Sequence, residues 1–135
     1  MPVYILGTLD TKGPEVAFVR ALLDELGVAV QVIDTGCMGE PAFVGDVPRD
    51  AVFQAAGTTL AEMRARGDRG EAVTRAAAGA TALIADLHAA GKVDGVLGLG
   101  GSAGTSIATS AMRALPLGVP KLMVSTLASG QTRPY

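Results

Sequence analysis

The most constraining feature of this sequence is the alternation of four short apolar runs with longer stretches of helical periodicity. The apolar runs cover residues 3–9, 28–36, 95–100 and 119–126. Short, almost wholly apolar runs are typical of strands buried on both faces of a parallel sheet. The sequence therefore predicts an α/β fold, a Rossmann-like three-layer sandwich with a parallel sheet of four or more strands and right-handed crossovers. The simplest order of the four strands, numbered along the chain, is 2-1-3-4.

The segments between these runs carry apolar residues at helical spacing. They predict helices over residues 14–26, 59–67, 68–91 and 102–115. The two middle segments begin with capping pairs, Thr59 with Glu62 and Asp68 with Glu71. Residues 37–57 show no sustained period and are expected to be irregular, with one or two helical turns.

Composition limits both the number of domains and the partners. A chain of 135 residues, 49% of them hydrophobic, is expected to form a single domain over residues 1–135. The net charge of -2 without a basic cluster, and an aromatic content of 4%, argue against nucleic acid as a partner. One cysteine and no signal-peptide pattern favour a cytoplasmic location. The longest charge-free stretch, residues 95–112, is too rich in Gly, Ser and Thr to predict a membrane span.

Two glycine-rich loops are predicted to meet at one point. In the order 2-1-3-4 the first and third strands are neighbours whose connections leave in opposite directions, and ligands bind at such a switch point. The loops there are "GTLDTKG", residues 7–13, and "GLGGSAGT", residues 98–105. Each leads into a helix amino end, where free N–H groups favour an anion, so a phosphate is the expected ligand. The alternative is that the glycines serve only tight turns and close packing.

The second loop does not match the common nucleotide motifs in full. It lacks the Lys and Ser/Thr that follow the last glycine of a P-loop. Gly98, Gly100 and Ala103 fit the loose dinucleotide pattern, but no acidic residue follows at the distance needed to hold a ribose. NAD is therefore not the expected ligand.

Charged residues near these loops are further candidates. Lys12 could neutralise a phosphate and Asp10 could hold Mg²⁺, or the two could be a solvated loop pair. Asp34, followed by Gly36 in "DTG", could reach a ribose hydroxyl or a metal, or form a turn. No convincing catalytic set emerges, and Cys37 is expected to be an inert thiol.

Several motifs together carry a family resemblance. "GTLDTKG", "DTG", "DRGEAV", "GLGGSAGTSIAT" and "VSTLASGQTRPY", in this order, resemble the amino-terminal domain of the Tm-1-like, or UPF0261, family over essentially the whole chain. The resemblance implies an ATP-binding Rossmann-like domain that is normally followed by a second domain. The family includes the plant Tm-1 resistance protein, which blocks tobamovirus RNA replication by binding the viral replication protein.

The resemblance also assigns residues to a nucleotide site. It implies one wall made of Gly7, Thr8, Asp10, Thr11 and Lys12. The other wall consists of Gly100, Gly101, Ser102, Gly104 and Thr105. Residues 125–130, "STLASG", are expected to close the site through Thr126 and Ser129, while Gln131 replaces an expected acidic or other polar residue.

The expected function is that of an ATP-binding domain, with Mg²⁺ as a further expectation. The alternatives are half of an ATP-using phosphotransferase or ligase-like site completed by a second domain, and a protein-interaction module. Residues 127–135 cannot supply a covering helix, so the fourth strand is expected to be left bare. We therefore expect a carboxyl-terminal partner domain, or a homo-oligomer when the chain is alone.

Overall fold

The computed structural model of the chain describes residues 1–128, 130 and 132–135. Strands and helices alternate along it as the apolar runs predict. The elements are β1 (Val3–Gly7), α1 (Gly13–Glu25), β2 (Val30–Asp34), α2 (Arg49–Ala55), α3 (Leu60–Arg66), α4 (Arg69–Ala89), β3 (Gly95–Gly100), α5 (Ser102–Arg113) and β4 (Lys121–Ser125).

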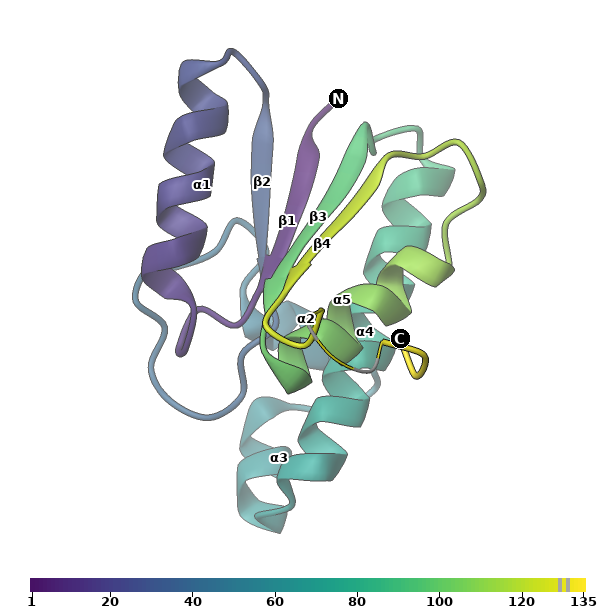
Figure 1. Cartoon of the computed structure of the whole chain (residues 1–135). Coiled ribbons are helices and arrows are strands. Elements are labelled where there is room, and N and C mark those ends of the chain that lie inside the picture. Colours follow the sequence, from purple (N-terminus) through teal and green to yellow (C-terminus); the bar gives the residue numbers. More distant parts are fainter. Residues whose placement is uncertain (129, 131) are drawn as a thin grey trace.

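The four strands form one parallel sheet in the order β2-β1-β3-β4 (Figure 1). This confirms the predicted α/β, Rossmann-like class and the predicted strand order. Gly7 at the end of β1 lies opposite Asp34 of β2 and Leu99 of β3. The carboxyl ends of the three strands therefore share one edge of the sheet, and the loops that follow them start side by side.

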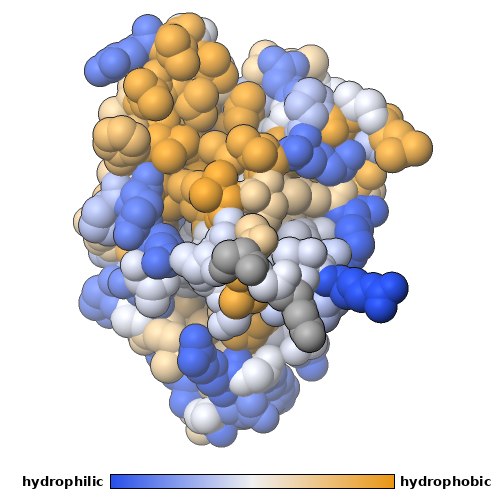
Figure 2. Space-filling view, in the orientation of Figure 1, coloured by the Kyte–Doolittle hydropathy of each residue, from blue (hydrophilic) through white to orange (hydrophobic). Residues whose placement is uncertain are grey.

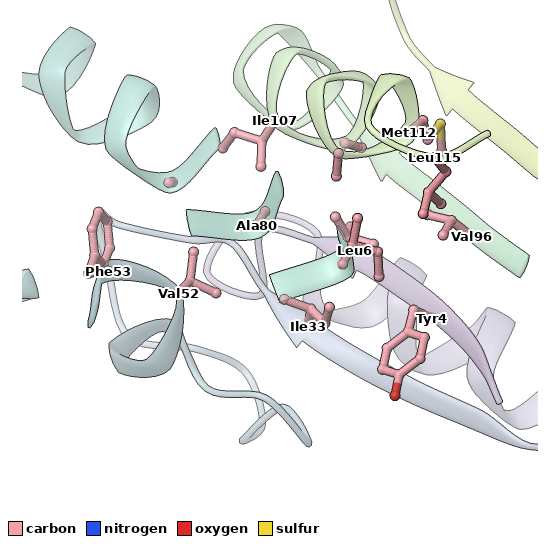
Figure 3. Packing of buried hydrophobic residues seen from close by; sticks show 14 of the residues in the cluster. Tyr4, Leu6, Ile33, Val52, Phe53, Ala80, Val96, Ile107, Met112 and Leu115 are labelled. Carbon is pink, nitrogen blue, oxygen red and sulfur yellow. The ribbon is translucent and has the colours of Figure 1, made fainter. Parts of the chain in front are cut away.

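Helices cover the two faces of the sheet unequally. α1 packs on β1 and β2, whereas α2 and α5 pack on the opposite face and α4 lies against both of these helices. Because strand side chains alternate, Ile5 packs in the cluster under α1 and Leu6 in the larger cluster on the other face. Figure 3 shows this larger cluster, to which the helices contribute Phe53 and Ile107 and the sheet contributes Leu6 and Ile33.

The helix ends confirm the capping predictions. The Thr59 hydroxyl accepts the N–H of Glu62 at 3.1 Å, and the Asp68 carboxylate accepts the N–H of Glu71 at 3.0 Å. Gly67 ends α3 in the left-handed region, with φ of 67°. The irregular stretch before α3 contains two turns of helix, α2, as expected.

Three of the four strands, β1, β2 and β4, are shorter than their apolar runs. The first run was predicted to be a strand through Leu9, but β1 ends at Gly7 and Leu9 is fully buried in the following loop. Its apolar character thus reflects packing beneath the loop, not strand pairing. No helix in the described part of the chain has the length and apolar character needed to cross a bilayer.

On the α1 side of the sheet, no helix of the described residues covers the half formed by β3 and β4. Leu122 and Val124 of β4 pair in register with Leu97 and Leu99 of β3, which belong to the cluster on the α1 side. Because α1 stops over β1 and β2, Leu122 is 60% and Val124 53% exposed. Figure 2 shows apolar surface running from α1 across this part of the sheet.

Candidate functional site

A cavity of about 240 Å³ lies where the loops after β1 and β3 meet. The first loop contributes Thr8, Asp10, Thr11 and Lys12, and the second contributes residues 101–104. The remaining lining residues come from the loop after β2 and from α4 and α5. They are Thr35, Cys37, Met38, Arg69, Val73 and Ile107.

Seven of the residues predicted for the nucleotide site line this cavity. They are Thr8, Asp10, Thr11, Lys12, Gly101, Ser102 and Gly104. Gly7 and Gly100 are buried at the strand ends behind it, and the buried Thr105 shares a hydrogen bond with Ser125. Thr126 lies with Lys12 and Gly100 around a neighbouring hollow. Ser129 and Gln131 lie outside the described residues.

The loop after β1 folds back on itself and presents Lys12. The Thr8 carbonyl accepts the N–H groups of Thr11 at 3.1 Å and Lys12 at 2.7 Å, and the hydroxyls of Thr8 and Thr11 share a hydrogen bond. The Lys12 ammonium makes no ion pair with any described residue. Its positive charge at the cavity wall is therefore available to an anionic ligand.

The loop after β3 brings the amino end of α5 to the cavity. Gly101 is the residue before the helix, and its carbonyl accepts the N–H of Thr105 at 2.9 Å. The helical residues before Thr105 also have backbone N–H groups, and these have no acceptor within the helix. Such groups, together with the helix dipole, favour an anion.

The glycines of this loop have different reasons to be glycine. A Cβ at Gly98 would lie 2.5 Å from the Met123 sulfur, and one at Gly100 would lie 2.7 Å from the Gly104 Cα, so both glycines are required by packing. A Cβ at Gly101 would meet nothing closer than the Thr126 hydroxyl, at 3.7 Å. Internal packing therefore does not explain the missing side chain at Gly101.

Asp10 links the loop after β1 to the loop after β2. Its Oδ2 atom accepts the N–H groups of Met38 at 2.9 Å and Gly39 at 3.0 Å. Its Oδ1 atom is buried without a hydrogen-bond partner among the described residues. Asp10 therefore shapes the cavity wall while retaining one carboxylate oxygen without a partner.

The possible metal ligands around the cavity can be compared with those that the expected magnesium ion requires. The described residues hold no group of three or more His, Cys, Asp or Glu side chains arranged for a metal. Mg²⁺ in nucleotide sites is held by one or two carboxylates and by the phosphates themselves. Asp10 supplies one carboxylate at the cavity wall, but its Oδ2 accepts two N–H groups and its Oδ1 is buried, so a bond from Asp10 to Mg²⁺ stays a prediction.

Asp34 has its oxygens engaged inside the protein. Its Oδ1 accepts the N–H groups of Leu9 at 3.2 Å and Gly36 at 2.9 Å, and its Oδ2 pairs with Arg49 Nε at 2.9 Å. Neither Asp34 nor Gly36 lines the cavity. Contact of Asp34 with a ribose or metal stays a prediction, and the role visible in the structure is to hold the loops after β1 and β2.

Sequence reasoning missed Arg49, which the fold buries beside Asp34 and Asp10. The Arg49 guanidinium also donates to the Gly39 carbonyl, while its Nη2 atom is buried without a partner among the described residues. A Cβ at Gly36 would lie 2.6 Å from Nη2 and 2.7 Å from Asp10 Oδ1, so Gly36 is glycine because these two groups fill the space. The one available signal was that a buried Asp needs a cationic partner.

The cavity wall also contains Cys37, Met38 and Arg69, which were not predicted to bind a ligand. Burial raises the pKa of the Cys37 thiol, as does the Asp10 carboxylate, while the Arg49, Arg69 and Arg64 guanidiniums oppose this shift. A raised pKa favours the protonated thiol at neutral pH, and the inert cysteine stays a prediction.

Fold and cavity together define a class, namely a doubly wound α/β domain whose candidate ligand site lies at the switch point of its sheet. Within this class the chain belongs to the UPF0261 family. The family model described as "Uncharacterised protein family (UPF0261) N-terminal domain" matches residues 1–135. This confirms the resemblance inferred from the motifs.

Relatives match nearly the whole chain but are much longer. A UPF0261 protein of Clostridium tetani is 43% identical over 133 residues, which make up 98% of this chain and 33% of that protein. A UPF0261 protein of Mesorhizobium japonicum is 42% identical over 98% of this chain and 32% of its own length. The ToMV susceptible protein tm-1 of Solanum lycopersicum is 33% identical over 98% of this chain and 20% of its own length. The chain thus spans about a third of the bacterial relatives.

Proposed function

We propose that this domain binds a nucleotide, ATP with Mg²⁺, and holds its phosphates between the loops after β1 and β3. The observation that carries the proposal is the convergence of three anion-binding elements on one cavity. These are the Lys12 ammonium, which has no ion pair among the described residues, the hydroxyls of the threonines in the first loop, and the amino end of α5. Each favours a phosphate for an independent reason, namely charge, hydrogen bonding and helix dipole.

Each wall has its own part in this proposal. The N–H groups at the start of α5 and the Ser102 hydroxyl donate to phosphate oxygens, while Lys12 neutralises their charge from the opposite wall. Gly101 leaves room for the phosphate beside the backbone, since among the described residues only the Thr126 hydroxyl approaches that space, at 3.7 Å from a Cβ. Bound Mg²⁺ supplies further neutralisation of the phosphates, and Asp10 is the residue that would hold it.

The test compares ligands that differ in phosphate by calorimetric titration in the presence of Mg²⁺. Lys12→Ala is expected to weaken ATP binding about tenfold or more, because a charged hydrogen bond is lost, and to change adenosine binding much less. Lys92→Ala is the matched control, because Lys92 is an exposed lysine next to the amino end of β3, at the other edge of the sheet. Equal losses for ATP and adenosine would show that Lys12 does not bind phosphate.

A further inference from the structure

A second hollow of about 230 Å³ adjoins the cavity between the loops. The two share Cys37, Met38 and Arg69, and the second extends to the junction of α3 and α4. They therefore form one groove that leads from the edge of the sheet to the start of α4 and to α3, which lies below the sheet in Figure 1. The residues that line only the second hollow are Met63, Arg64, Gly67, Asp68 and Ala72.

The size of the two hollows indicates a ligand that occupies both. Pockets for small organic ligands have volumes of about 300 Å³ or more. The loop cavity, at about 240 Å³, falls below this limit, and so does the second hollow, at about 230 Å³. The loop cavity by itself is large enough for a phosphate chain, whereas a whole nucleotide requires the groove formed by both hollows.

The chemistry of the second hollow differs from that of the first. The buried Met63 lines it, and Cys37, Met38 and Ala72 add further apolar surface. Methionine sulfur makes favourable contacts with aromatic rings, and an arginine guanidinium stacks on their faces. Arg64 lies at this hollow without an ion pair among the described residues, and the Asp68 carboxylate caps α4.

We propose that the second hollow binds the base of the nucleotide, with the ring between the methionine side chains and the Arg64 guanidinium. The assignment rests on the proposed binding of phosphates in the loop cavity. It makes Arg64 and Met63 contacts for the aromatic ring, whereas Lys12 and the α5 amino end contact only the phosphates. Arg69, which lines both hollows, lies between the two parts of the ligand.

The experiment measures ATP and inorganic tripolyphosphate binding by calorimetry in the presence of Mg²⁺. The unmodified chain is expected to bind ATP more tightly than tripolyphosphate. Arg64→Ala is expected to weaken ATP about five- to tenfold, because a cation stacked on a ring is lost, with a much smaller effect on tripolyphosphate. Ala72→Leu, which fills the hollow without changing the charge, is expected to act in the same direction.

Arg66→Ala is the matched control for the charge change. Arg66 lies on the same helix, two residues from Arg64, but pairs with Glu71 and lines neither hollow. It should leave the preference for ATP over tripolyphosphate unchanged. Equal affinities of the unmodified chain for the two ligands, or equal losses of both in Arg64→Ala, would overturn the base assignment and leave phosphate binding intact. Failure of both ligands to bind would overturn the two proposals together.

Discussion

The buried pair of Asp34 and Arg49 shows how single residues shape the candidate site without lining it. Arg49 bonds to the end of β2 through Asp34 and to the following loop through the Gly39 carbonyl, and Asp10 binds the same loop from the other side. Removing one member of a buried ion pair leaves the other charged and unpaired, which is strongly destabilising. These residues therefore fix the position of the cavity wall that contains Cys37 and Met38.

Substitutions at the adjacent Gly100 and Gly101 test two different roles, internal packing at Gly100 and access of a ligand at Gly101. Gly101→Val should abolish ATP binding in a folded protein, because the branched side chain enters space that the protein leaves open. Gly100→Ala should instead destabilise the fold, by about 1–3 kcal/mol as overpacking does, because its Cβ would overlap the backbone of Gly104. Urea denaturation and titration with ATP measure the two effects. Unchanged ATP affinity in a folded Gly101→Val variant would mean that this glycine serves the turn alone.

At the scale of elements, the sequence predicted what depends on local chemistry. The caps at Thr59 and Asp68 and the bounds of β3 came directly from neighbouring residues, and the strand order followed from chain connectivity. The β1 and β3 loops were predictable because parallel strands end at one edge of the sheet. Arg49 was not predictable, because packing of the loop after β2 brings it to the site from a position without a local signature. Arg69 lies in the quoted "DRGEAV" motif, but only the packing of α4 shows that it lines the cavity.

The packing of α4 against α2 gives a test at this scale. Gly79 of α4 lies so close to the Val52 carbonyl of α2 that a Cβ would overlap it. Gly79→Ala should therefore lower the free energy of unfolding, although alanine has the higher helix propensity by about 1 kcal/mol. Gly70→Ala is the matched control, since Gly70 is exposed in the same helix and its nearest neighbour beyond the adjacent residues is the Asp68 carboxylate, at 3.3 Å. A Gly79→Ala variant as stable as the unmodified chain in thermal melts would contradict this packing.

For the molecule as a whole, the apolar face beside α1 determines how the isolated chain behaves. Leu122 and Val124 of β4 are apolar residues that no described helix covers, and Phe18 of α1 is also exposed, at 70%. Burial of such surface is favourable by about 25 cal/mol per Å². Exposed apolar strands at a sheet edge are also templates for association, which natural proteins usually cover.

We expect the 135-residue chain to self-associate through this face, with a second copy of the chain as the cover. The double variant Leu122→Lys/Val124→Lys should shift the chain to monomer, because burying two lysines opposes the contact and charged edge strands resist pairing. Leu117→Lys makes the same kind of change at a leucine that is 100% exposed in the turn before β4 and should leave the association unchanged. Light scattering at micromolar concentration measures the outcome. If the unmodified chain is monomeric under these conditions, the apolar surface is stable in water and the prediction is wrong. If Leu117→Lys disrupts association as much as the double variant does, the β4 face is not the contact, which also contradicts the prediction.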